Sequence, residues 1–199
     1  MHRAHTLAVD IAVVLPPVIR EEAERINRLL VSHSGDMTIS FGPGAIPHIT
    51  LAMAAVPETD LAGISLEGLR PHLPLEITIT GLSTVTTGSG RRVAGFDLSP
   101  DRPLLALHRA AAGTLAPVAV DEVPALLLRE GEGDEPTMAA YARTFLRTPY
   151  SPHITLGAGE ASERDTTLSL PYRFTAQGAM LCRVGTGGAC RQVLREISI

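Results

Sequence analysis

The chain has no tryptophan, and aromatic residues make up only 4% of its 199 residues. Single-stranded nucleic acid is commonly bound by stacking its bases on aromatic side chains. Positive charge is also scarce, because 17 Lys and Arg residues face 21 Asp and Glu residues, giving a net charge of −4. A protein that binds long nucleic acid normally carries a basic surface. We therefore expect no long nucleic acid as a partner, and any RNA substrate to be bound at an end or over a few nucleotides.

Long hydrophobic runs and cysteines are equally few. The longest apolar stretch, residues 11–17, is far shorter than the roughly 20 residues that a membrane-spanning helix needs. It follows a weakly charged start without a cleavage-site pattern, so we expect a cytoplasmic protein with no membrane partner. Cys182 and Cys190 flank a glycine-rich turn and could face each other across a hairpin. Their small number favours reduced thiols and gives no support for a cysteine-based active site.

The remaining composition is that of a globular protein with one sizeable core or two small lobes sharing one, 45% hydrophobic and 19% charged. Hydrophobic periodicity and turn residues predict strands and helices that alternate along the chain. The predicted strands cover residues 6–15, 37–41, 47–56, 75–86, 92–98, 168–183 and 192–199, besides one at the second motif described below. The predicted helices cover residues 18–32, 59–69, 103–115 and 137–146, and an acidic loop at 130–136 is the clearest break. Strands joined by short turns and interleaved with helices indicate an α+β fold with antiparallel sheets.

One five-residue word, Pro-His-Ile-Thr-Leu, occurs twice, at residues 47–51 and 152–156. A chance repeat of this length in such a chain would arise at roughly the one-in-a-hundred level. Because side chains alternate along a strand, His48 and Thr50 share one face while the aliphatic residues share the other, and His153 and Thr155 do the same. The repeat predicts a single domain, residues 1–199, with two pseudo-symmetric lobes of antiparallel sheet and outer helices. The lobes would span roughly 1–100 and 101–199, with strands possibly exchanged, around a shared cleft.

The paired residue types indicate a definite chemistry. Imidazole titrates near neutral pH, and a threonine hydroxyl is a short hydrogen-bond donor beside it. Two such pairs facing each other supply one group to accept a proton, one to donate it, and two hydroxyls to hold the oxygens of an anion. Phosphodiester cleavage or formation at a ribose hydroxyl needs this set of groups and no metal.

Two His-x-Thr-hydrophobic words, one in each half of a chain of this size, resemble the motifs of the 2H phosphoesterase superfamily. That superfamily includes the bacterial 2′-5′ RNA ligase and cyclic phosphodiesterase groups. The flanks at residues 38–52 and 150–157 are similar to those of the family as well. The resemblance implies an enzyme acting on 2′,3′-cyclic phosphate or 2′-5′ linked RNA ends or nucleotides, without a cofactor. His48 and His153 would be its acid and base, and Thr50 and Thr155 its phosphate ligands.

Several alternatives stay open at this point. A lone His-x-Thr is usually the polar face of a strand, and a duplicated hairpin would explain the repeat without chemistry, although packing does not require histidine at both places. The same fold could be a non-catalytic nucleotide or RNA-end binding module, or a hydrolase of a small cyclic nucleotide such as ADP-ribose 1″,2″-cyclic phosphate. A metal shared by the two histidines would lack an obvious third ligand in either motif. Tyr150 could stack on a base or simply pack. Arg143 and Arg147, and Arg91 and Arg92 at a turn, could meet a phosphate, although a solvated face is the default interpretation. A monomer is expected, and the identical motifs do not distinguish acid from base.

Overall fold

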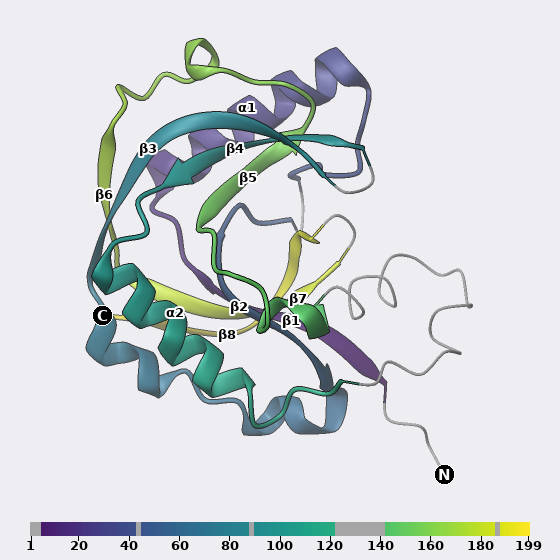
Figure 1. Ribbon diagram of the computed structural model, residues 1–199, viewed down its shortest axis with the longest axis vertical. Coiled ribbons are helices and arrows are strands. Elements are labelled where there is room, and N and C mark those ends of the chain that lie inside the picture. The colour runs from purple at the N-terminus through teal and green to yellow at the C-terminus, as the bar shows by residue number, and fades with distance from the viewer. Residues whose placement is uncertain (1–4, 43–44, 88–89, 122–141, 186–187) are drawn as a thin grey trace.

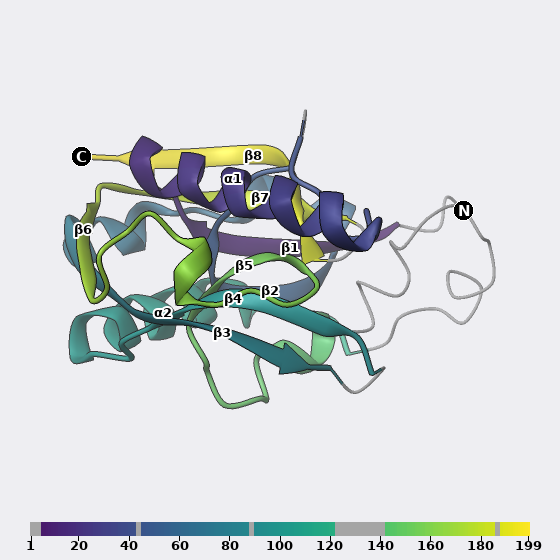
Figure 2. The same cartoon turned by 90° about the horizontal axis from the view of Figure 1, so that it is seen from above.

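A computed structural model describes residues 5–42, 45–87, 90–121, 142–185 and 188–199. The strands in this part of the chain form two four-stranded antiparallel sheets, which confirms the predicted α+β class (Figures 1 and 2). The first sheet has the order β2–β1–β7–β8, with β1 Thr6–Val13, β2 Ile49–Pro57, β7 Gly178–Val184 and β8 Cys190–Ser198. The second has the order β5–β4–β3–β6, with β3 Leu75–Thr86, β4 Arg92–Leu98, β5 His153–Ala158 and β6 Tyr172–Ala176.

The two sheets are built alike. In the first, β1 leads through helix α1 (Pro17–Ser34) to the edge strand β2, and in the second, β4 leads through helix α2 (Arg102–Leu115) to the edge strand β5. Each sheet also takes two further strands from elsewhere in the chain. The helices cross over, because α1 packs against β5 and α2 packs against β2 (Figure 1). Each helix therefore supports the edge strand of the opposite sheet.

A single hydrophobic cluster extends across both sheets and both helices. It includes Val9 of β1, Ile26 of α1, Phe96 of β4 and Ile154 of β5, all fully buried. Because one contiguous core joins the two sheets, they depend on each other for burial of apolar surface. No helix within the described residues combines the length and the apolar character needed to cross a membrane.

Most predicted elements appear close to their expected bounds, and three do not. Residues 37–41 contain a turn rather than a strand. The side chain of Asn27 hydrogen-bonds the backbone carbonyl of Ile39 and the backbone amide of Phe41, in place of a partner strand. Residues 59–69 form no α-helix. Two short 3₁₀ helices, η1 (Glu58–Gly63) and η2 (Glu67–His72), occupy this region and are separated by an extended residue, Ile64, whose side chain is buried.

The third error concerns residues 168–183, predicted as one long strand. The chain breaks at residue 177 into β6 and β7, which belong to different sheets. Gly178 lies so close to β8 that a Cβ atom there would be 2.6 Å from the carbonyl oxygen of Ile197, which accounts for glycine at this crossing. The acidic loop 130–136 and residues 137–141 of a predicted helix lie outside the described residues, and residues 142–145 are helical.

One buried carboxylate fastens α1 to the segment that leads into β6. Glu22 is 6% exposed and accepts two hydrogen bonds from Arg25 at 2.8 and 2.9 Å. It also accepts from the hydroxyl of Thr166 and from the amide and hydroxyl of Thr167, at 2.6–3.0 Å. The Arg25 hydrogen bond, opposed by burial and assisted by the two threonines, lowers the pKa of Glu22 from 4.5 to about 2.

Glu22→Gln should destabilise the protein in a pH-dependent manner. Because the folded-state pKa lies below the ordinary value, the contribution of the carboxylate is complete above about pH 4.5 and is lost as the pH falls towards 2. Urea unfolding at pH 7 should give a free energy of unfolding on the order of 2–3 kcal/mol below that of the wild type, and this gap should narrow at pH 3. Glu21→Gln, on the exposed neighbouring residue, is the control. A gap of equal size at both pH values would contradict the ionised Glu22 network.

Candidate active site

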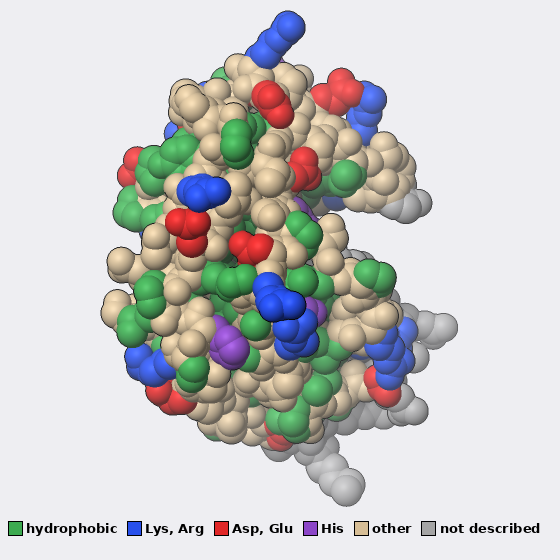
Figure 3. Space-filling model, turned by 60° about the vertical axis from the view of Figure 1, so that its left-hand side comes forward, with side chains coloured by type: hydrophobic (Ala, Val, Ile, Leu, Met, Phe, Trp, Pro, Cys, Tyr) green, Lys and Arg blue, Asp and Glu red, His purple; other side chains and the backbone are tan. Residues whose placement is uncertain are grey.

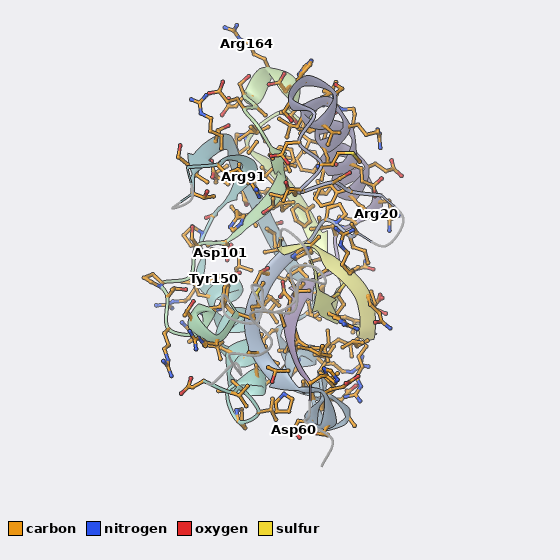
Figure 4. All side chains as sticks on the ribbon, turned by 90° about the vertical axis from the view of Figure 1, so that its right-hand side faces the viewer. Arg20, Asp60, Arg91, Asp101, Tyr150 and Arg164 are labelled. Atoms are coloured by element: carbon orange, nitrogen blue, oxygen red, sulfur yellow. The ribbon has the colours of Figure 1, made fainter. Side chains whose placement is uncertain are left out.

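The two repeated motifs come together where the sheets meet. His48 immediately precedes β2 and His153 begins β5, and these two edge strands contact each other. In the space-filling view the molecule is hollowed on one side between its two halves, with histidine side chains at the margin (Figure 3). Asp60 and Arg164 mark the two ends of the long axis, and Tyr150, just before the second motif, lies near its middle (Figure 4). The motifs therefore share the junction between the lobes.

Both imidazoles are held by the same local hydrogen bond. Nδ1 of His48 lies 2.8 Å from the carbonyl oxygen of Ile46, and Nδ1 of His153 lies 2.9 Å from that of Ser151. A carbonyl oxygen can only accept, so each Nδ1 carries the hydrogen and each neutral ring presents an unprotonated Nε2. In both motifs the acceptor is two residues before the histidine. The repeated sequence thus produces a repeated ring orientation with Nε2 as the reactive nitrogen.

A small cavity joins the first motif to the second. It is lined by His48 from one motif and Thr155 from the other, together with Ile39, Phe41, Gly188 and Ala189. Its volume of about 20 Å³ gives room for roughly one water-sized group. His153 and Thr155 lie on the same face of β5, because they are two residues apart in a strand. His48 and Thr155 therefore line one cavity, and His153 lies on the same strand face as Thr155.

Asp10 is a member of this site that sequence reasoning missed. It is fully buried on β1, and its Oδ2 lies 3.3 Å from Nε2 of His48 and accepts the hydroxyl hydrogen of Thr50 at 2.6 Å. Burial raises the pKa of the Asp10 carboxyl, and its partners oppose that rise only in part. Burial lowers the pKa of His48, but the hydrogen bond and charge of Asp10 outweigh it, so the pKa of His48 is raised. A charged residue in the middle of an otherwise apolar strand was the available signal.

The two motifs differ in what lies behind them. Thr50 pairs with Ala12 across the sheet, two residues after Asp10, and Thr155 pairs with Gly95 in the corresponding place. Two residues before Gly95 the chain has Val93, so the position that Asp10 occupies in the first lobe holds an apolar residue in the second. Asp97, which is opposite His153 in the register, accepts a hydrogen bond from Ser83 at 2.8 Å. Identical sequence motifs therefore occupy unequal electrostatic surroundings.

Tyr150 braces the first motif strand. Its hydroxyl donates to the carbonyl oxygen of Thr50 at 3.1 Å, and its ring stacks on His108 of α2 with ring centroids 3.9 Å apart. Nδ1 of His108 in turn donates to the carbonyl oxygen of Leu51 at 2.7 Å. Of the two roles considered for Tyr150, the structure shows packing, with one face of its ring against His108. The pair fixes the backbone of β2 beside the site.

Asn27, the chain's only asparagine, braces the second motif strand and the cavity wall. Its Nδ2 donates to the carbonyl oxygens of Ile39 and Leu156, both at 2.8 Å, and its Oδ1 accepts from the amide of Phe41 at 2.8 Å. Ile39 and Phe41 line the cavity, and Leu156 follows Thr155. Gly157 permits this approach, because its φ of +153° and a Cβ position 2.9 Å from Nδ2 of Asn27 would strain any other residue.

The arginines near the second motif and at the β3–β4 turn interact with acidic residues. Arg147 and Arg143 bind the side chain and the carbonyl oxygen of Asp121, respectively. Arg91 lies 3.9 Å from Asp36, and Arg92 is paired with Glu160. These contacts agree with their interpretation as solvated surface residues.

Solved structures with this architecture exist, although no family model and no curated protein matches the sequence. TT0787 of Thermus thermophilus is 19% identical over 96% of this chain and 97% of its own, with a TM-score of 0.56. Escherichia coli LigT in complex with 3′-AMP is 18% identical over 98% and 99%, with a TM-score of 0.54. This chain has the LigT fold. A phosphoesterase structure is similar to the same degree, at 18% identity, 98% and 99% coverage and a TM-score of 0.52. At the level of fold, these likenesses confirm the resemblance to the 2H phosphoesterase superfamily seen in the two motifs.

Asn27→Ala should lower the free energy of unfolding by about 3 kcal/mol or more, because it leaves two buried carbonyls and one amide without partners. Chemical denaturation measures this loss, and Arg28→Ala, on the exposed side of the same helix, serves as the control. Equal stabilities of the two variants would show that Asn27 does not hold β5 and the cavity wall.

Proposed function

We propose that this protein is a metal-independent phosphodiesterase or ligase of the two-histidine type, acting on a 2′,3′-cyclic phosphate or a 2′-5′ linkage at an RNA end or in a nucleotide. The observation that carries the proposal is the matched pair of imidazoles, each held at Nδ1 by a carbonyl two residues away, at the junction of β2 and β5. The likeness to LigT, which has been crystallised with 3′-AMP, supports a small nucleotide or an RNA end as the substrate. The scarcity of positive charge agrees with a substrate of few phosphates.

In the hydrolytic direction we assign proton donation to His48 and proton acceptance to His153. The Asp10 carboxylate stabilises the imidazolium form of His48, whereas the equivalent position behind the second motif is Val93. The Nε2–Oδ2 separation of 3.3 Å is longer than the roughly 2.7–2.9 Å of a strong charge-assisted bond, so the hydrogen on Nε2 can be given to a leaving group. His153 takes a proton from water as the water oxygen attacks phosphorus. His48 protonates the leaving ribose oxygen. In ligation the two roles reverse.

We assign different roles to the two threonines. Thr155 lines the cavity with His48, and its hydroxyl would donate to a non-bridging phosphate oxygen, where negative charge grows in the transition state. The single hydroxyl hydrogen of Thr50 is directed at Asp10. Thr50 can therefore bind phosphate only after turning that hydrogen away from the carboxylate. The cavity is too small for a nucleoside, so the base and sugar of the substrate would lie outside it.

Turnover should survive chelation, because two imidazoles and two hydroxyls supply acid, base and anion contacts without a cation. The assay combines the protein and EDTA with 2′,3′-cyclic mononucleotides, 2′-5′ dinucleotides and ADP-ribose 1″,2″-cyclic phosphate. Turnover of the first two classes is the expected result, whereas turnover of the third alone would identify a small-nucleotide hydrolase. Binding without turnover of any substrate would identify a non-catalytic module, and a requirement for a divalent ion would overturn the mechanism.

His48→Ala and His153→Ala should each lower kcat by roughly 10²–10⁴, the range for a positioned acid or base. The double variant should lose much less than the product of the two single losses, because both groups act in one proton-transfer sequence. His33→Ala, on an exposed histidine of α1, is the matched control. Near-normal turnover in both single variants would place the chemistry elsewhere.

Thr155→Val keeps the shape of the side chain but removes the hydroxyl, and should cost on the order of 2–4 kcal/mol in transition-state stabilisation. Thr155→Ser should restore most of the rate, because it restores the donor. Steady-state kinetics on the best substrate of the panel measure both variants. Equal loss in the two would indicate a packing role for Thr155.

A further inference from the structure

Three side chains with metal-binding atoms converge around His48. Asp10 of β1, His48 and Cys190 of β8 each offer one ligand atom, and these atoms all lie within 4.8 Å of one another. Asp10 and Cys190 are fully buried and the His48 side chain is 10% exposed. We propose that these three residues form a binding site for a divalent cation of the zinc class, and that the bound cation inhibits the enzyme by occupying His48. The inhibition rests on the proposed function, whereas the metal site does not.

The set of donors selects the class of ion. One thiol, one imidazole and one carboxylate are the sulfur, nitrogen and oxygen ligands that zinc accepts, at about 2.0–2.3 Å. A thiol is a poor ligand for magnesium or calcium, and a carboxylate is a poor one for copper(I). A tetrahedral site with such bond lengths has edges of about 3.3–3.8 Å. The separation of 3.3 Å between Asp10 and His48 already has this value, so closure on a cation requires a shift of no more than about 1.5 Å by Cys190.

A buried carboxylate oxygen of Asp10 without a hydrogen-bond partner is an independent observation in favour of the site. Oδ2 of Asp10 is shared by His48 and Thr50, but Oδ1 is buried and has no hydrogen-bond partner among the residues that the structure describes. A buried carboxylate with an unsatisfied oxygen is costly unless a cation or further donors compensate it. A divalent cation with one carboxylate, one thiolate and one neutral imidazole is electrically neutral as a whole. The occupied site would therefore add no buried net charge.

The cavity beside His48 offers a fourth ligand position. His48 lines it together with Gly188 and Ala189, and Ala189 directly precedes Cys190. The cavity has room for roughly one water-sized group, which would complete a coordination of three protein ligands. Because Nδ1 of His48 is bonded to the carbonyl oxygen of Ile46, the nitrogen left for the cation is Nε2. That is the same nitrogen from which the proposed reaction takes its proton, so cation and catalysis compete.

The neighbouring cysteine offers a matched control. Cys182 of β7 is opposite Asp10 in the register and shares a side-chain hydrogen bond with Cys190, and both thiols are buried. Its sulfur is nevertheless not one of the three mutually close ligand atoms. The two cysteines therefore differ in the predicted role while sharing chemistry and burial.

Cobalt(II) titration of the full-length reduced protein, without substrate, tests the site. The wild type and Cys182→Ser should show thiolate-to-cobalt charge-transfer absorption that saturates at one equivalent, together with the visible bands of a tetrahedral ion. Cys190→Ser and, as a second substitution, Cys190→Ala should lack the charge-transfer band. No band in the wild type, or a band that persists without Cys190 and vanishes without Cys182, overturns the proposal.

Zinc titration of turnover then tests the inhibition. Zinc should inhibit the wild type and Cys182→Ser, with EDTA restoring the rate, while Cys190→Ser should keep its basal turnover and need at least about tenfold more zinc for the same inhibition. Activation by zinc, or equal inhibition of both cysteine variants, overturns the inhibitory role. The cobalt spectra involve no substrate, so they decide the metal site even where the proposed reaction fails.

Discussion

The contact between the edge strands β2 and β5 is the constraint on which the site depends. Neither sheet alone carries both histidines, and the two edges are held together because α1 packs on β5 while α2 packs on β2. Asn27 on one helix and His108 on the other then hydrogen-bond the backbones of the motif strands. Loss of the contact between α1 and β5, or of that between α2 and β2, would therefore displace the motif strand that the helix supports. The contacts that stabilise the fold therefore also set the geometry of the site.

Much of this arrangement could be predicted from the sequence, because the relevant signals are local. Strand alternation placed His153 and Thr155 on one face, and turn residues gave the bounds of β3 and β4 as the structure has them. Asp10 had a signal in the sequence, as a charged residue in an apolar strand, but its role, the role of Asn27 and the proposed role of Cys190 depend on contacts between residues distant in the chain, such as the bond from Asn27 to Leu156. The same long-range bonding explains the error at residues 37–41, where a side chain replaces the partner strand.

The unequal surroundings of the two motifs matter for their chemistry. A reaction that both accepts and donates a proton needs two groups in different protonation states, and two identical environments would favour neither assignment. Asp10 supplies the difference by placing a carboxylate beside one imidazole, where the second lobe has Val93. The difference lies on β1 and β4, outside both motifs, so the repeated words themselves do not distinguish acid from base.

The hydrogen bond from each Nδ1 to the carbonyl two residues earlier has a consequence for how such a protein can diverge after an internal duplication. Each ring is held by a backbone carbonyl within its own tripeptide, and this bond does not depend on the identity of neighbouring side chains. Substitutions around either copy can accumulate while the ring keeps its direction. The two halves can thus differ in sequence and still present paired nitrogens, provided that the short repeated word is kept.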